Sequence, residues 1–60
     1  NSEAWIENYR GILEYTGERI LLQAKTCQVC LEGTRLSIDY YTNEDMKISG
    51  NISALRYLRE

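Results

Sequence analysis

The sequence predicts a small all-β domain built as an antiparallel β-meander. Apolar residues alternate with polar ones along most of the chain, tyrosine and β-branched residues are frequent, and turn signals recur at short intervals. The pattern leaves open whether the strands form a single sheet, a sandwich or an open barrel. A β-solenoid is the alternative, because turns containing Gly17, Gly33 and Gly50 recur about every sixteen residues.

Two short strands are predicted in the N-terminal part. The first covers residues 5–9, and the second covers residues 11–15, where two adjacent apolar residues leave the facing ambiguous. Gly11 is either a kink between them or a bulge in one long strand. Thr16-Gly17-Glu18 predicts the turn that follows, because glycine adopts a positive φ without steric cost.

Alternating apolar residues predict four further strands, over residues 19–24, 27–32, 36–41 and 46–52. Gly33-Thr34 separates two of them, and Gly50-Asn51 interrupts the last. A final strand over residues 54–58 fits the alternation only if a bulge near Ser53-Ala54 adds one residue. The alternative for this tail is a helix over residues 53–60 with Ser53 as its N-cap.

Composition excludes several classes of function. The chain has 60 residues, a formal net charge of −2, two cysteines, no histidine and no proline. Without histidine there is no imidazole base, no Ser–His or Cys–His pair and no histidine-containing zinc site. Two cysteines cannot fill four metal positions, and the negative charge argues against a nucleic-acid partner. We therefore expect a single domain with no enzymatic activity, no cofactor and no membrane span.

Two short motifs resemble chemical sites without the context that such sites need. Cys27-Gln28-Val29-Cys30 has the spacing of a thioredoxin-like dithiol, but no helix N-terminus is predicted beside it. In an extended strand the two cysteines lie roughly 10 Å apart on opposite faces, and a disulfide needs Cα atoms within about 7 Å. A turn at Cys27 would shorten this spacing and permit the bond. Asn43-Glu44-Asp45 offers oxygen ligands for Ca²⁺, but it is more typical of a solvated turn in which Asn43 or Asp45 bonds to the backbone.

Apolar residues also fall on the side of the predicted sheet that is opposite to the main core. A lone meander should be polar there, and a chain of 60 residues is at the margin of what can bury a sufficient core. We therefore expect another subunit, a missing segment or a partner to cover this face. The predicted interface residues are Leu13, Tyr15, Leu21 and Tyr41, with Cys30 on the same side. Strand addition at a sheet edge is a second route to association, and a sandwich or barrel that closes over both faces is the alternative.

Spaced apolar residues and glycines recur in three segments, IENYRGILEY (residues 6–15), LEGTRLSI (31–38) and YYTNEDMKISGNI (40–52). With them the chain resembles the YabP/YqfC family of small sporulation proteins, nearer to its YqfC branch. The resemblance implies expression in the mother cell, in its cytoplasm or at the surface of the forming spore, and it brings no catalytic residues. The family pattern has glycine where this chain has Cys27, so a turn with positive φ there would strain Cys27. A segment that often precedes this region is absent, which, with the start at Asn1, suggests a fragment lacking N-terminal residues.

The sequence thus predicts a non-enzymatic, sporulation-associated structural or assembly protein. It would associate through sheet faces or edges, as a homo-oligomer and with other sporulation proteins. The alternative function is a small β-barrel module that binds nucleic acid or a small ligand, with its exposed aromatic residues as a stacking platform.

Overall fold

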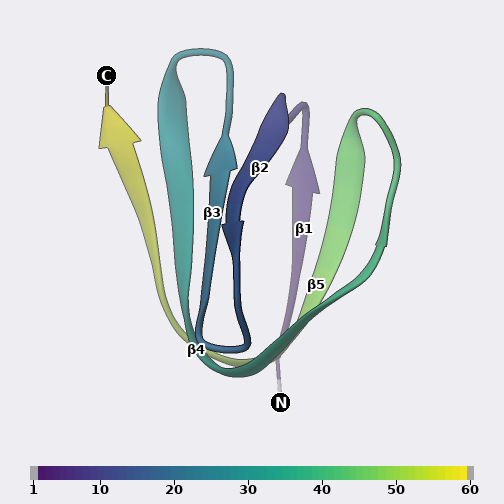
Figure 1. Ribbon diagram of the computed structural model, residues 1–60, viewed down its shortest axis with the longest axis vertical. Coiled ribbons are helices and arrows are strands. Elements are labelled where there is room, and N and C mark those ends of the chain that lie inside the picture. Colours follow the sequence, from purple (N-terminus) through teal and green to yellow (C-terminus); the bar gives the residue numbers. More distant parts are fainter. Residues whose placement is uncertain (1, 60) are drawn as a thin grey trace.

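The computed structural model describes residues 2–59 and contains five antiparallel strands in one open sheet (Figure 1). They are β1 (Ser2–Glu7), β2 (Gly11–Tyr15), β3 (Arg19–Gln23), β4 (Cys27–Tyr41) and β5 (Asp45–Arg59), in the spatial order β1-β5-β4-β3-β2. The predicted all-β antiparallel fold is confirmed. The solenoid alternative and the helical tail are both wrong, because every strand pair is antiparallel and residues 53–59 continue β5.

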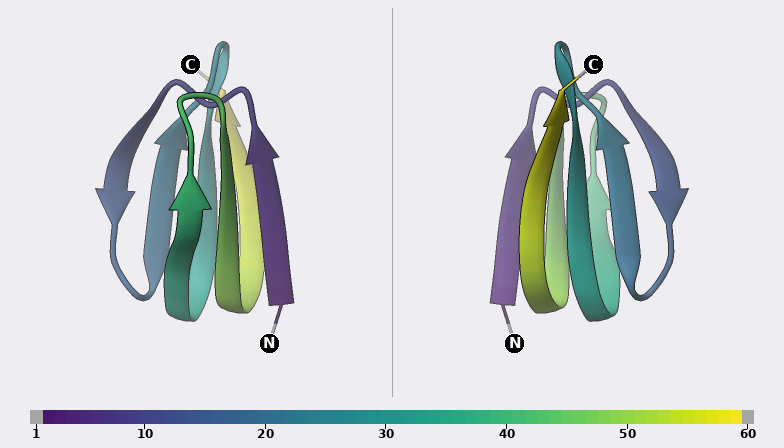
Figure 2. Two further views of the ribbon diagram at one scale, coloured as in Figure 1. Left: turned by 90° about the vertical axis from the view of Figure 1, so that its right-hand side faces the viewer. Right: turned by 90° about the vertical axis from the view of Figure 1, so that its left-hand side faces the viewer.

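β4 and β5 are each 15 residues long, and both bend near the middle, so that the sheet folds over on itself (Figures 1 and 2). The sequence predicted separate strands here, with breaks at Gly33-Thr34 and at Gly50-Asn51, whereas the structure has bends within two continuous strands. The large layer consists of β2, β3, residues 27–34 of β4 and residues 51–59 of β5. The small layer consists of β1, residues 36–41 of β4 and residues 45–50 of β5.

Close backbone contact between the two long strands marks the bend. The register of β4 with β5 shifts there, Arg35 has a φ of 55°, and Gly50 has a φ of 137°. A Cβ on Gly50 would lie 2.5 Å from the carbonyl oxygen of Arg35, and a Cβ on Gly33 would collide with the carbonyl oxygen of Asn51. The two glycines therefore permit an approach that any side chain would prevent.

A second register shift lies on the far side of the bend. Glu32 pairs with Ala54 and Gly33 pairs with Ile52, which leaves Ser53 without a partner residue. This confirms the predicted bulge near Ser53-Ala54. Because the bulge reverses the alternation, the residues that follow it face the core side at odd-numbered positions, as the pairing of Leu55 with the buried Leu31 shows.

The core lies between the two layers. Buried apolar side chains come from both layers and comprise Tyr9, Ile20, Leu22, Val29, Leu31, Leu36, Met46 and Ile48. Tyr9 enters from the connection between β1 and β2, because the strand predicted over residues 5–9 ends at Glu7 and Asn8 has a φ of 61°. The Tyr9 hydroxyl donates a hydrogen bond of 2.6 Å to the carbonyl of Thr42, so its polar end is satisfied.

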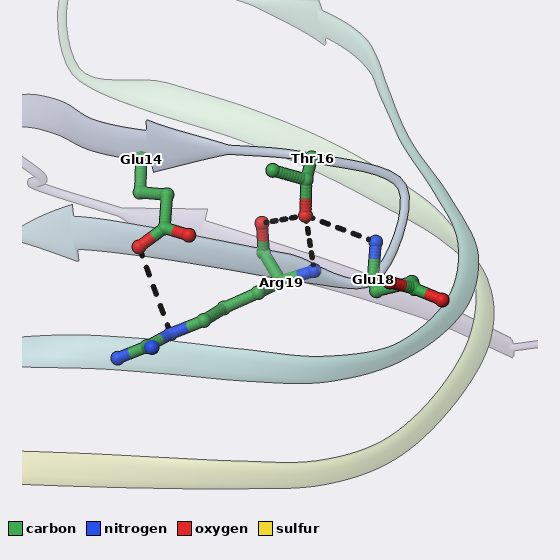
Figure 3. Close-up of polar contacts among 4 residues, drawn as sticks. All are labelled: Glu14, Thr16, Glu18 and Arg19. Carbon is green, nitrogen blue, oxygen red and sulfur yellow. Dashed lines mark hydrogen bonds and ion pairs between the residues drawn. The ribbon is translucent and has the colours of Figure 1, made fainter.

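The turn between β2 and β3 is held by a side chain and not by a special glycine conformation. The hydroxyl of Thr16 accepts hydrogen bonds from the backbone N–H groups of Glu18 at 3.1 Å and Arg19 at 2.9 Å (Figure 3). The expected positive φ at Gly17 is wrong, since Gly50 is the glycine with a positive φ. The turn also docks on the bend of β4, where the N–H of Leu36 donates to the carbonyl of Gly17 at 2.7 Å.

Candidate interaction surfaces

Trp5, Tyr40 and Lys47 form one row across the outer face of the small layer. Both aromatic residues pair with Lys47 in the sheet register, and side chains of directly paired residues lie on the same face. The two rings meet edge to face at 5.8 Å, and the Lys47 ammonium lies 5.6 Å from the Trp5 ring and 3.3 Å from the Glu3 carboxylate. Trp5 is 57% exposed, so the row presents aromatic surface to solvent beside a paired charge.

No single face holds the four residues predicted as an interface, Leu13, Tyr15, Leu21 and Tyr41. Leu21 lies on the outer face of the large layer, opposite to its buried neighbours on β3. Tyr15 and Tyr41 pair with buried core residues, so the register places them on the core-facing side, at the margins of their layers. Leu13 lies at the register shift in β2 and is about half exposed.

Tyr15 links the two layers at the β2 side of the molecule. Its hydroxyl accepts a hydrogen bond of 3.0 Å from the backbone N–H of Ile38 in the small layer. Half of the side chain remains exposed. Tyr15 therefore contributes to holding the layers together, in addition to presenting apolar surface.

Ion pairs and a buried thiol occupy the outer face of the large layer. Arg19 lies 3.8 Å from the Glu14 carboxylate (Figure 3), and Arg56 lies 3.4 Å from that of Glu32. A side-chain hydrogen bond with Cys30 raises the pKa of Arg19, as do its neighbouring acids. Two of the chain's arginines are thus matched to carboxylates, which weakens the electrostatic argument for a phosphate-binding face.

The two cysteines are free thiols in different surroundings. Cys30 is buried on the outer face, where it pairs with Leu21, whereas Cys27 is partly buried and packs against the core. Cys27 begins β4, and its carbonyl accepts a hydrogen bond of 2.8 Å from the N–H of Ala24 at the end of the β3–β4 hairpin. The strain expected from a positive φ at Cys27 is absent, since the non-glycine residues with positive φ among residues 2–59 are Asn8 and Arg35.

The carboxylate pair Glu44-Asp45 lies in the hairpin between β4 and β5. The hydroxyl of Thr42 accepts hydrogen bonds from the N–H groups of Glu44 at 3.2 Å and Asp45 at 3.0 Å. The sequence assigned this capping role to Asn43 or Asp45, but the threonine performs it, as Thr16 does in the β2–β3 turn. Within the described part of the chain, residues 2–59, no three His, Cys, Asp or Glu side chains group as a metal site.

The longest unpaired edge of the sheet belongs to the second half of β5. β1 pairs with β5 only between Asp45 and Gly50, and among the described residues no strand pairs with the outer edge of residues 53–59, which we call the β5 edge. A pocket of about 190 Å³ lies beside this edge, where the two layers diverge. It is lined by Trp5, Ile6, Glu7, Ala24, Cys27, Val29 and Tyr57.

Comparison with protein families adds an independent observation to this geometry. The model of the YabP family matches residues 1–60, which is the whole chain. The chain belongs to the YabP family. No curated protein matches it. Membership in the YabP family is consistent with a sporulation-related protein. Among residues 2–59 of this YabP family member, no helix is long and apolar enough to cross a membrane.

The sequence did not predict two surfaces of this YabP family member. The alternation of Trp5 with Ala4 and Ile6 already indicated that Trp5 faces away from the core, but its pairing with Tyr40 depends on a register shift in β4. The β5 edge depends on the bend at Gly50, which carries the rest of the strand away from β1. Neither the shift nor the bend is encoded in the local alternation of apolar residues.

Proposed function

We propose that this YabP family member is a non-enzymatic structural or assembly protein of sporulation, which acts by protein–protein association through its sheet surfaces and edges. The observation that carries the proposal is the amount of large apolar surface left exposed on so small a protein. Nine large apolar side chains are between 39% and 69% exposed: Trp5, Ile12, Leu13, Tyr15, Tyr40, Tyr41, Leu55, Tyr57 and Leu58. Trp5 and Tyr40 among them are in contact, and contiguous exposed apolar surface is typical of protein interaction sites.

The roles of the polar side chains support the same proposal. The hydroxyls of Thr16 and Thr42 cap turns, and the charges of Glu3, Glu14 and Glu32 meet lysine or arginine. These groups therefore serve the fold. What the protein offers to a partner is aromatic and aliphatic surface bordered by charge, which is the usual composition of an interaction surface.

A test of this function uses sporulating cells that carry lysine substitutions at exposed apolar positions. We expect Trp5→Lys or Leu13→Lys to lower the yield of heat-resistant spores while the protein remains folded, because a lysine at an interface centre is costly to desolvate. Lys25→Ala, at an exposed position in the β3–β4 turn, is the control and should leave the yield unchanged.

The native size of the protein in extracts of the same cells completes the test. We expect the unmodified protein to migrate in a complex larger than one chain, and the variants with low spore yield to shift toward the monomer. Normal spore yield from every folded apolar-surface variant, together with monomeric migration of the unmodified protein, would contradict the proposed function.

A further inference from the structure

Four strand edges are open among residues 2–59, and three of them carry features that obstruct the addition of another strand. The edge of β2 is interrupted by the register shift between Ile12 and Glu14. The edge of β4 in the small layer is shifted between Ile38 and Tyr40, and the N–H of Ile38 is already bonded to Tyr15. Bulges and occupied donors are devices that keep sheet edges from pairing.

The two remaining edges differ in charge and in length. The outer edge of β1 belongs to a six-residue strand that carries two exposed acids, Glu7 and Glu3, of which Glu3 is matched by Lys47 at 3.3 Å. The β5 edge is longer, and its residues from Ala54 to Arg59 pair with β4 without any register shift. No lysine or proline occurs within it, the charge of Arg56 is matched by Glu32 at 3.4 Å, and its other charge, Arg59, lies at its last residue. The β5 edge is thus regular and the least protected of the four.

Apolar side chains flank the β5 edge on both sides. Leu55 and Tyr57 pair with the buried Leu31 and Val29, so they lie on the core-facing side, where they are 41% and 69% exposed. Trp5 lies across the pocket of about 190 Å³ that opens beside them. Figure 1 shows β1 and the end of β5 in different layers, which diverge from the bend. A strand added to β5 would cover this pocket and bury Leu55 and Tyr57.

From this geometry we infer that the β5 edge pairs with the β5 edge of a second copy of the chain, in antiparallel orientation. The inference deepens the proposed function, on which it rests, by naming the surface and the partner. Antiparallel pairing of two identical edges is a two-fold symmetric contact, the commonest arrangement of homo-oligomers. It joins the two large layers into one continuous sheet. It also brings Leu55 and Tyr57 of both copies onto one face, where each pocket receives an apolar side chain from the other copy.

The exposed apolar side chains supply part of the area that such a contact requires. Leu55, Tyr57 and Leu58 are between 41% and 69% exposed, which corresponds to roughly 350 Å² of surface. A stable interface buries about 800 Å² on each partner, and the strand backbone and the arginine stems supply part of the rest. Since the whole chain exposes 4155 Å², the contact would cover about a fifth of its surface.

Sedimentation equilibrium of the chain across the micromolar range tests this inference, with two matched variants. Tyr57→Lys places a charge on the core-facing side of the β5 edge, and we expect it to raise the dissociation constant of the dimer at least about tenfold. Tyr41→Lys is the control, because Tyr41 is also a strand tyrosine with 64% exposure but lies in the small layer. It should leave the dimer intact. Far-UV circular dichroism shows whether both variants fold.

Amide hydrogen exchange of the unmodified chain gives a second measurement that needs no substitution. Dilution from the dimer should speed exchange between Ala54 and Leu58 and leave the amides of β2 unchanged. A monomer at every concentration, or a dimer whose protected amides lie outside the β5 edge, would overturn the inference. So would a dimer that Tyr41→Lys weakens as much as Tyr57→Lys does. These outcomes leave the proposed function standing, because that function fails only if the folded surface variants form spores normally and the unmodified protein migrates as a monomer in cell extracts.

Discussion

The bend that divides the sheet into two layers depends on Gly50, and this dependence can be measured. Gly50→Ala forces an L-residue to a φ of 137°, which costs about 1–3 kcal/mol. The new Cβ would lie 2.5 Å from the Arg35 carbonyl oxygen, and relieving such a contact costs about 1–3 kcal/mol more. We therefore expect Gly50→Ala to lower the free energy of unfolding by about 2–6 kcal/mol. A domain of this size has only about 3–9 kcal/mol in total.

Urea unfolding, followed by the fluorescence of Trp5 and by circular dichroism at one fixed protein concentration, measures this loss. The thermal midpoint should fall by at least about 10 °C. Gly17→Ala is the matched control, because no atom lies within 4 Å of its added Cβ and its φ is not positive. It should be neutral or stabilising by about 0.4–1 kcal/mol, through the loss of freedom in the unfolded chain. If the two variants were equally stable, the bend would not depend on Gly50, and our account of the two layers would be refuted.

Two further predictions concern the turn and the thiols. Thr16→Ala should lower the free energy of unfolding by about 1–2 kcal/mol, because the N–H groups of Glu18 and Arg19 lose their acceptor. Thr16→Ser keeps the hydroxyl and should keep most of the stability. Thermal unfolding of both variants measures the difference. A reductant should not change the thermal midpoint, because Cys27 and Cys30 are free thiols on opposite faces of β4. A lower midpoint in the presence of the reductant would show that the two cysteines form a disulfide.

Local patterns predicted the strands of this protein more reliably than their continuity. The alternation over residues 27–32 and 36–41 was correctly assigned to strands, and the bulge near Ser53 followed from the one break in the alternation. The sequence alone did not show that Gly33 and Gly50 mark bends within β4 and β5, because glycine is equally typical of a turn that ends a strand. Whether such a glycine bends a strand or ends it depends on whether the two strands remain paired beyond the glycines.

For the candidate surfaces, too, the local pattern predicted the facing of some residues correctly and of others wrongly. Leu21 was assigned to the outer face from its position between two core residues, and the register agrees. Tyr15 and Tyr41 were assigned to the same face, but the shifts in β2 and β4 move them to the core-facing side. A single inserted residue reverses the facing of every residue after it, so errors of this kind accumulate along a chain with several bulges.

By itself, the sequence determined that this protein is an all-β domain with an apolar core drawn from alternating positions. These properties follow from contacts between residues close in the chain, or from the two-residue period of a strand. Only the tertiary structure decided that β4 and β5 run through the bend, that Trp5 meets Tyr40, and that the β5 edge is left open. These features depend on pairing between residues far apart in the chain, where one bulge or one close glycine contact outweighs the local pattern.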